Sequence, residues 1–175
     1  METQTLQSTD SKLREFFVEQ LKDIYWAEQK LVKTLPKLED AATTPQLKEA
    51  FVNHLHQTEE HVSRLEQIFG MVNEEAEAKK CRAMSGIVDE GEHIIDETEE
   101  GTSQRDVGLI FAGQKAEHYE IATYGGLISL AKTLGLDGAV NMLHLTLAEE
   151  KAADQLLTQI AENNVNYLAS LEAVE

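Results

Sequence analysis

Two glutamates one helical turn apart stand in an otherwise apolar part of the sequence. The segment QKAEHYEIATYGG, residues 114–126, contains Glu117 and Glu120 next to Ile121 and Tyr124. Burying one unpaired carboxylate is costly, and the group either takes up a proton or needs a partner of opposite charge. Two carboxylates on one helix face therefore indicate bound protons, a buried hydrogen-bond network or a metal ion.

The same interruption of the apolar pattern occurs in three other segments. Apolar residues recur every three or four positions in four long stretches, and each stretch has polar side chains near its middle. Two divalent or trivalent ions would offset about four carboxylate charges, and oxygen-rich ligands with a few imidazoles favour iron or manganese. The pattern thus predicts a dinuclear metal site. Its candidate ligands are Glu28, His54, His61, Glu117, Glu120, Glu150 and Asp154.

The spacing of these candidates departs from the usual rule for di-iron helix bundles. That rule takes one Glu from each of two helices and Glu-x-x-His from each of the other two. Here Thr58 stands three residues before His61, and Ala153 stands three residues after Glu150. On spacing alone, metal ligation therefore competes with a buried network that holds no metal.

Several candidates also have an ordinary structural role open to them. His54 and His61 are each more often packed or solvated residues than ligands when they stand alone on a helix. Asp154 has an alternative partner in Lys151. His118 lies about 100° around the helix from Glu117, so we expect it to be structural or interfacial.

Four long helices must bring the candidates together. Hydrophobic periodicity predicts helices over residues 11–41, 45–70, 104–134 and 137–162. Short turns join the first pair and the second pair, and a long crossover with one short helix joins the pairs. These features predict an all-α, ferritin-like four-helix bundle with one crossover.

The ends of these helices can also be predicted. Pro36 is expected to kink or interrupt the first helix near Leu35, and Gly70 is expected to end the second. Asn163 and Asn164 are expected to end the fourth. Residues 1–10 are predicted to be flexible, with Ser8, Thr9 or Asp10 as helix cap. The bundle would span 11–166, followed by a C-terminal tail at 167–175.

Composition limits the class of function. The 175 residues include 32 acidic and 15 basic side chains, giving a formal net charge of −17. Such a field repels nucleic acid and anionic membranes and concentrates cations. A single cysteine, Cys81, suits a reducing compartment, and we find neither a signal peptide nor a long apolar segment. The sequence therefore predicts a cytoplasmic protein without nucleic-acid or membrane partners.

Four runs of the sequence resemble the YciF/YciE family of ferritin-like bacterial stress proteins, and the YciF branch more closely. They are LKDIYWAEQKL, HLHQTEEHVSRLEQ, AEHYEIATYGGLISLAKTLG and LAEEKAADQLL. The resemblance implies a homodimer and, by similarity to rubrerythrin-type di-iron proteins, a metal site. The implied ligands are Glu28, Glu117, Glu120 and Glu150, with Asp154 nearby.

The second helix departs from the family pattern. Where members of the family often read His-Leu-x-Glu-Thr, this chain reads HLHQT, with Gln57 in place of the acid. The resemblance therefore puts tight binding of a second metal in question, although His54 or His61 could compensate. Gln57, Thr58 and Tyr124 are expected to lie beside the ligands rather than among them.

Two functions from different classes remain open at this point. The first is a stress-associated, non-haem dimetal carboxylate protein that handles iron, dioxygen or peroxide, with a di-iron oxidoreductase or peroxidase-like activity as its enzymatic form. The second is a non-catalytic helical dimer whose metal site is degenerate or empty. Metal storage in a ferritin shell has no support in the sequence beyond the shared fold.

Overall fold

The computed structural model describes residues 11–173, and this part of the chain is helical without any strand. The predicted all-α class is confirmed. Residues 1–10, including the cap candidates Ser8, Thr9 and Asp10, lie outside the described part. The elements are α1 Lys12–Ala41, α2 Pro45–Met71, α3 Arg82–Glu97, α4 Ser103–Thr133, α5 Asp137–Ile160, the π-helical turn η1 Ala161–Val165 and α6 Asn166–Ala169.

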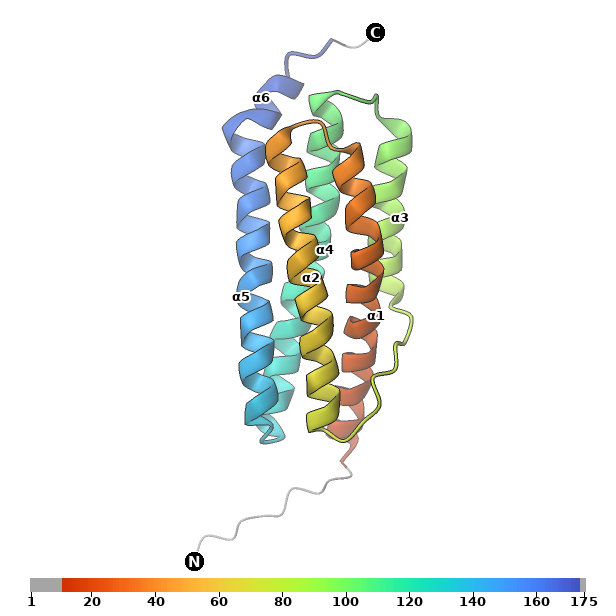
Figure 1. Cartoon of the computed structure of the whole chain (residues 1–175), viewed down its shortest axis with the longest axis vertical. Coiled ribbons are helices and arrows are strands. Elements are labelled where there is room, and N and C mark those ends of the chain that lie inside the picture. Colours follow the sequence, from red (N-terminus) through yellow and green to blue (C-terminus); the bar gives the residue numbers. More distant parts are fainter. Residues whose placement is uncertain (1–10, 174–175) are drawn as a thin grey trace, which may run out of the picture.

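Helices α1, α2, α4 and α5 lie side by side along the long axis of the molecule (Figure 1). Short turns connect α1 to α2 and α4 to α5. Residues 72–102 connect α2 to α4 and carry α3, which packs against α1 and α4. At the start of this connection, the Lys79 N–H donates to the Lys22 carbonyl of α1 at 3.0 Å. None of the described helices is long and apolar enough to cross a membrane.

Pro36 does not interrupt α1, although the sequence led us to expect a kink or a break near Leu35. The helix continues to Ala41, with Pro36 on its exposed side. Leu35 and Leu38, on either side of Pro36, are both buried in the core. We attribute the continuity to this packing, because burial of two leucines can offset the cost of about 3 kcal/mol that a helical proline carries.

Gly70 does not end α2 either, because Asn73 takes the turning position. Asn73 has a positive φ of 55°, in the left-handed region. Its N–H donates to the Gly70 carbonyl at 3.2 Å, and the Glu74 N–H donates to the Phe69 carbonyl at 3.0 Å. These two bonds form a Schellman motif with Asn73 as its left-handed residue.

Two other helix ends also differ from the predicted ones. Ser11 caps α1, because its side chain accepts a hydrogen bond from the Arg14 N–H at 3.1 Å. At the other end of the chain, α5 ends at Ile160, and the backbone continues through η1 into α6. Asn163 and Asn164 therefore lie inside a helical path that they were expected to end.

A buried carboxylate on α4 caps the N-terminus of α2. Thr44, the N-cap residue, makes no capping bond with its own side chain. Asp106 accepts instead from the backbone N–H groups of Thr43 at 2.6 Å and Thr44 at 2.8 Å. Its side chain is 0% exposed. Asp106 thus ties the α1–α2 turn to α4 and helps to set the position of α2 relative to α4.

Replacing Asp106 with Ala is expected to lower the free energy of unfolding by about 2–4 kcal/mol, because two partly buried N–H groups lose a charged acceptor. Urea unfolding of the purified protein measures this loss. The matched control is Asp40→Ala, since Asp40 is exposed near the end of α1. A loss below about 1 kcal/mol for Asp106→Ala would contradict the assigned role, because that is an ordinary surface effect.

Candidate metal centre

Six ionisable side chains meet near the middle of the four long helices. They come from all four: one from α1, two each from α2 and α4, and one from α5. Two residues three or seven apart share a helix face, which explains how α2 and α4 each supply a pair. The six are Glu28, His54, His61, Glu117, Glu120 and Glu150, all buried.

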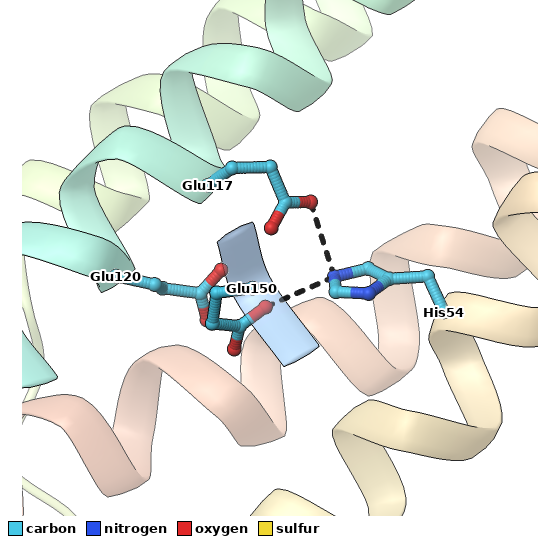
Figure 2. Close-up of side chains that lie close together, drawn as sticks. All are labelled: His54, Glu117, Glu120 and Glu150. Atoms are coloured by element: carbon cyan, nitrogen blue, oxygen red, sulfur yellow. Dashed lines mark ion pairs between the residues drawn. The ribbon is translucent and has the colours of Figure 1, made fainter. Parts of the chain in front are cut away.

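The six side chains form two groups that share Glu150. One group is His54, Glu117, Glu120 and Glu150, and the other is Glu28, His61 and Glu150. Within each group, one ligand atom per residue lies within 4.8 Å of every other. Figure 2 shows the first group, with Glu117 and Glu120 on α4 facing Glu150 and His54.

The distances place the two oxygens of Glu150 toward different histidines. Glu150 Oε1 lies 3.0 Å from His61 Nδ1, and Glu150 Oε2 lies 3.9 Å from His54 Nε2. His54 Nε2 also lies 3.2 Å from Glu117 Oε1, and His61 Nδ1 lies 3.5 Å from Glu28 Oε1. Glu150 therefore belongs to both groups, and each of its oxygens faces a different histidine.

Several carboxylate oxygens in the two groups lack a hydrogen-bond partner in the described part of the chain. They are both oxygens of Glu120, Glu28 Oε2 and Glu117 Oε2, whereas Glu150 Oε1 has His61 Nδ1 as an ion-pair partner at 3.0 Å. Buried polar groups in proteins are almost always paired. Such a buried cluster of acceptors could hold a metal ion.

Burial and mutual repulsion hold protons on part of this cluster. Burial, followed by the charge of Glu150, raises the pKa of both Glu117 and Glu120 well above the ordinary value. Burial alone would lower the pKa of His61, but Glu150 and Glu28 outweigh it and raise that pKa to about 10. In return His61 outweighs burial at Glu150 and lowers the Glu150 pKa. Metal binding would therefore release protons from these groups.

The hydroxyl groups of Tyr124 and Thr58 both donate hydrogen bonds to neighbours in or beside the cluster. The Tyr124 hydroxyl donates to Glu28 Oε1. Burial, followed by the charge of Glu28, raises the Tyr124 pKa well above its ordinary value, so this donor keeps its proton. The Thr58 hydroxyl donates to the backbone carbonyl of His54 at 2.8 Å.

Two residues of α2, Gln57 and Thr58, stand near the position where an acid was expected. Thr58 is fully buried and stands three residues before His61, where the Glu-x-x-His rule places a carboxylate. Gln57, which the family pattern singled out, is half-buried at the edge of the cluster. Thr58 thus matches the Glu-x-x-His spacing and is buried, whereas Gln57 matches the family pattern and lies nearer the surface.

Asp154 is the one predicted ligand that the structure leaves outside both groups. Its Oδ1 accepts from Gln114 Nε2 at 3.1 Å and lies 3.3 Å from His118 Nε2. His118 is itself mostly exposed. Asp154 thus has its partners on α4. Lys151, the alternative partner considered from the sequence, is not among them.

Glu149 is a functional candidate that sequence reasoning missed. Its Oε2 lies 2.9 Å from His61 Nε2, and its carboxylate also binds the Arg64 guanidinium, with Nη2 to Oε1 at 3.0 Å. With Nε2 held by Glu149, the other ring nitrogen of His61 faces Glu28 and Glu150. The only sequence signal was a second acid beside Glu150 in LAEEK, and helical periodicity assigns that position to another face.

Replacing Glu149 with Ala is expected to weaken metal binding at the His61 position by about 10–100-fold, as is usual for a carboxylate that orients a ligating histidine. Competition with a metal chelator measures the change, and the His61 ring proton in NMR reports whether Nε2 stays hydrogen-bonded. Glu60→Ala, an exposed acid one residue from His61, is the control. Equal metal affinity in both variants would show that Glu149 has no positioning role.

Comparison with known proteins places this chain among relatives of similar length. Residues 12–170 match the family described as "Domain of unknown function (DUF892)". The sequence is 42% identical to Protein YciF of Escherichia coli (strain K12) over 165 residues, which cover 92% of this chain and 97% of that protein.

Solved structures with the same fold include two close in sequence. The crystal structure of the E. coli stress protein YciF superposes with a TM-score of 0.85 at 41% identity, covering 90% of this chain and 99% of that one. YcfI of Rhodopseudomonas palustris, provisionally described as a structural protein, has a TM-score of 0.82 at 33% identity, covering 87% and 96%. A protein from Xanthomonas campestris at 19% identity and a TM-score of 0.69 shares the fold, covering 91% and 97%.

Proposed function

This chain belongs to the DUF892 family and is a relative of the stress protein YciF, and from that premise we propose that it is a stress-associated dimetal carboxylate protein. The proposed fold is the ferritin-like four-helix bundle, with α1, α2, α4 and α5 as its helices and residues 72–102 as its crossover. The proposed metals are iron or manganese, handled together with dioxygen or peroxide.

One observation carries the proposal. Glu120 is fully buried, and neither of its carboxylate oxygens has a hydrogen-bond partner in the described residues. A carboxylate in that position is destabilising unless it is protonated or bound to a cation. The nearest groups are other carboxylates and a histidine, which cannot all satisfy it but which suit a shared cation.

The residues present fit two metal ions of charge +2. His54, Glu117, Glu120 and Glu150 would hold the first, and Glu28, His61 and Glu150 the second. The four glutamates supply a charge of −4 when ionised, which two divalent ions balance, and the imidazoles bind as neutral ligands. When bound, such a pair of ions would supply electron transfer to dioxygen or peroxide.

Metal analysis of protein purified without chelator tests the proposal. Elemental mass spectrometry is expected to find close to two iron or manganese ions per chain, and dialysis against chelator is expected to lower the thermal stability. Protein reconstituted with Fe(II) or Mn(II) should recover that stability. Failure of both metals to bind above background, as purified and after reconstitution, would end the proposal.

A second candidate function is a helical module without catalysis. Two residues favour it. The Thr58 hydroxyl donates to the His54 carbonyl, and Ala153 stands three residues after Glu150, where di-iron bundles have a histidine. On that account, replacing both Glu117 and Glu120 with Gln leaves the stability of the protein as purified equal or higher. On the metal account, the same variant loses metal and becomes less stable than the protein as purified.

We also propose a homodimer, on the basis of the family relationship. Several large apolar side chains are exposed on the described part of the chain, among them Phe111 at 62% and Leu145 at 58%. Light scattering is expected to give twice the 19.5 kDa mass of one chain. A mass of one chain at micromolar concentration would rule out a stable dimer.

A further inference from the structure

A cavity of about 480 Å³ lies between α2 and α5 and reaches the first of the two ligand groups. Its residues on α2 and α5 form the walls and the mouth, and Glu117 of α4 lies at its inner end. The lining residues are Ala50, Phe51, Asn53, His54, Gln57, Glu117, Ala152, Ala153, Leu156 and Leu157. Cavities that bind small organic molecules usually measure about 300–1,000 Å³, so this volume is in the range of a ligand site.

The cavity reaches only one of the two proposed metal positions. His54 retains 7% exposure and Glu117 retains 3%, whereas Glu28, His61, Glu120 and Glu150 retain none. The cavity lining includes His54 and Glu117 and none of those four. A molecule entering from solvent therefore meets the group that contains His54 and Glu117, and the His61 position stays closed.

Ala153 explains why the cavity exists. It stands three residues after Glu150, where the Glu-x-x-His rule of di-iron bundles places a histidine that reaches the metal. With a methyl group at this position, the space that an imidazole would fill remains open. Small side chains at Ala50 and Ala152 widen the same space.

The lining indicates the chemistry of the occupant. Most walls are apolar, and the polar groups are the amides of Asn53 and Gln57 and the side chains of His54 and Glu117. The whole chain carries a net charge of −17, so anions are repelled. A neutral head group with an O–H donor can instead donate to a carboxyl oxygen of Glu117, which accepts whether or not that group holds a proton.

We propose that this cavity binds a neutral organic molecule with an apolar body and a single hydroxyl or hydroperoxyl head, which enters between α2 and α5 and meets Glu117 and His54. A hydroperoxyl head would make the occupant an organic hydroperoxide, so this assignment of substrate class rests on the proposed dimetal function. The volume supports a bulky substrate, because a water-sized molecule occupies only about 30 Å³.

The test is a titration of the ¹⁵N-labelled, metal-free full-length protein with 2-phenylpropan-2-ol, a stable alcohol with an apolar body. Amide signals of Asn53, Gln57 and Ala153 are expected to shift in a saturable way, with a dissociation constant in the millimolar range or tighter. Benzoate, of similar size but anionic, is expected to bind at least about tenfold more weakly.

Ala153→Trp is expected to fill the cavity and weaken binding of the alcohol at least about tenfold. The control is Ala122→Trp, since Ala122 is exposed on α4 away from the cavity lining. Asn53→Trp, at an exposed position of the lining, closes the mouth without a change in the core and replaces Ala153→Trp if that variant does not fold. The absence of saturable shifts, equal binding of benzoate, or unchanged binding in the filled variant would overturn the proposal.

Metal content measured on the same samples separates this inference from the function on which it rests. Two metals per chain without binding of the alcohol would overturn the cavity assignment and leave the dimetal function standing. Binding of the alcohol that Ala153→Trp abolishes, in protein that takes up no metal, would support the cavity as a ligand site and remove the hydroperoxide chemistry.

Discussion

Replacing Glu150 with Gln is expected to abolish tight binding of both metal ions, whereas replacing Glu28 with Gln should remove only one. Among the described residues, Glu150 is the side chain that belongs to both ligand groups. Its Oε1 lies 3.0 Å from His61 Nδ1 and its Oε2 lies 3.9 Å from His54 Nε2. An amide is a much poorer bridge between two cations than a carboxylate, because it has one oxygen and carries no charge.

The measurement is the metal-to-protein ratio after reconstitution with Fe(II) or Mn(II) and removal of excess metal. The expected ratios are about two for the unmodified protein, one for Glu28→Gln and near zero for Glu150→Gln. Glu162→Gln, an exposed acid in the π-helical turn η1 after α5, is the control and should retain two. Retention of one tightly bound ion by Glu150→Gln would show that the groups do not share this residue.

The metal-free protein is expected to lose stability as the pH rises from about 6.5 to about 8.5. Burial, with the charge of Glu150, raises the pKa of Glu117 and Glu120, so the folded state binds more protons than the unfolded state above the ordinary value of 4.5. His61, with its pKa raised to about 10 from 6.5, acts in the same direction across this window. The free energy of unfolding therefore falls with increasing pH.

Groups whose pKa is lowered in the folded state act outside the range of pH 6.5 to 8.5. Burial lowers the pKa of His54, and its effect on stability is confined to pH values below 6.5. His61 outweighs burial at Glu150 and lowers its pKa, with an effect confined to pH values below 4.5. Bound metal replaces the protons, so the loaded protein should instead be destabilised by acid, as its ligands are protonated.

Glu120→Gln is expected to stabilise the metal-free protein at pH 8 and to flatten its pH dependence. A shift of one pKa unit changes the free energy of unfolding by about 1.4 kcal/mol. For a chain of this size, that changes the melting temperature by about 3–5 °C. Thermal unfolding at several pH values, in chelator, measures both effects. Glu162→Gln is the control. If the melting temperature of Glu120→Gln changed with pH as steeply as that of the control, Glu120 would hold no proton above its ordinary range.

The tertiary structure decided several features that local patterns do not encode. Pro36 was expected to kink or interrupt α1, but the helix is not interrupted, and the buried Leu35 and Leu38 hold it together. Gly70 was expected to end α2, but Asn73 takes the left-handed position. The continuity of α1 depends on contacts between segments, whose free energy exceeds the intrinsic preference of one residue, whereas α2 ends in a local hydrogen-bonded motif.

The sequence by itself determined the helical class and the inward positions of Glu28, Glu117, Glu120 and Glu150, because helical periodicity is local and places these carboxylates on apolar faces. Their roles as ligands remain predictions. Only the tertiary structure decided that Glu150 joins two groups, that Asp154 pairs with Gln114 outside both, and that Glu149 reaches His61 across the α2–α5 interface. The physical reason is that periodicity specifies the face of each helix, whereas the relative height and rotation of neighbouring helices depend on how their side chains pack together.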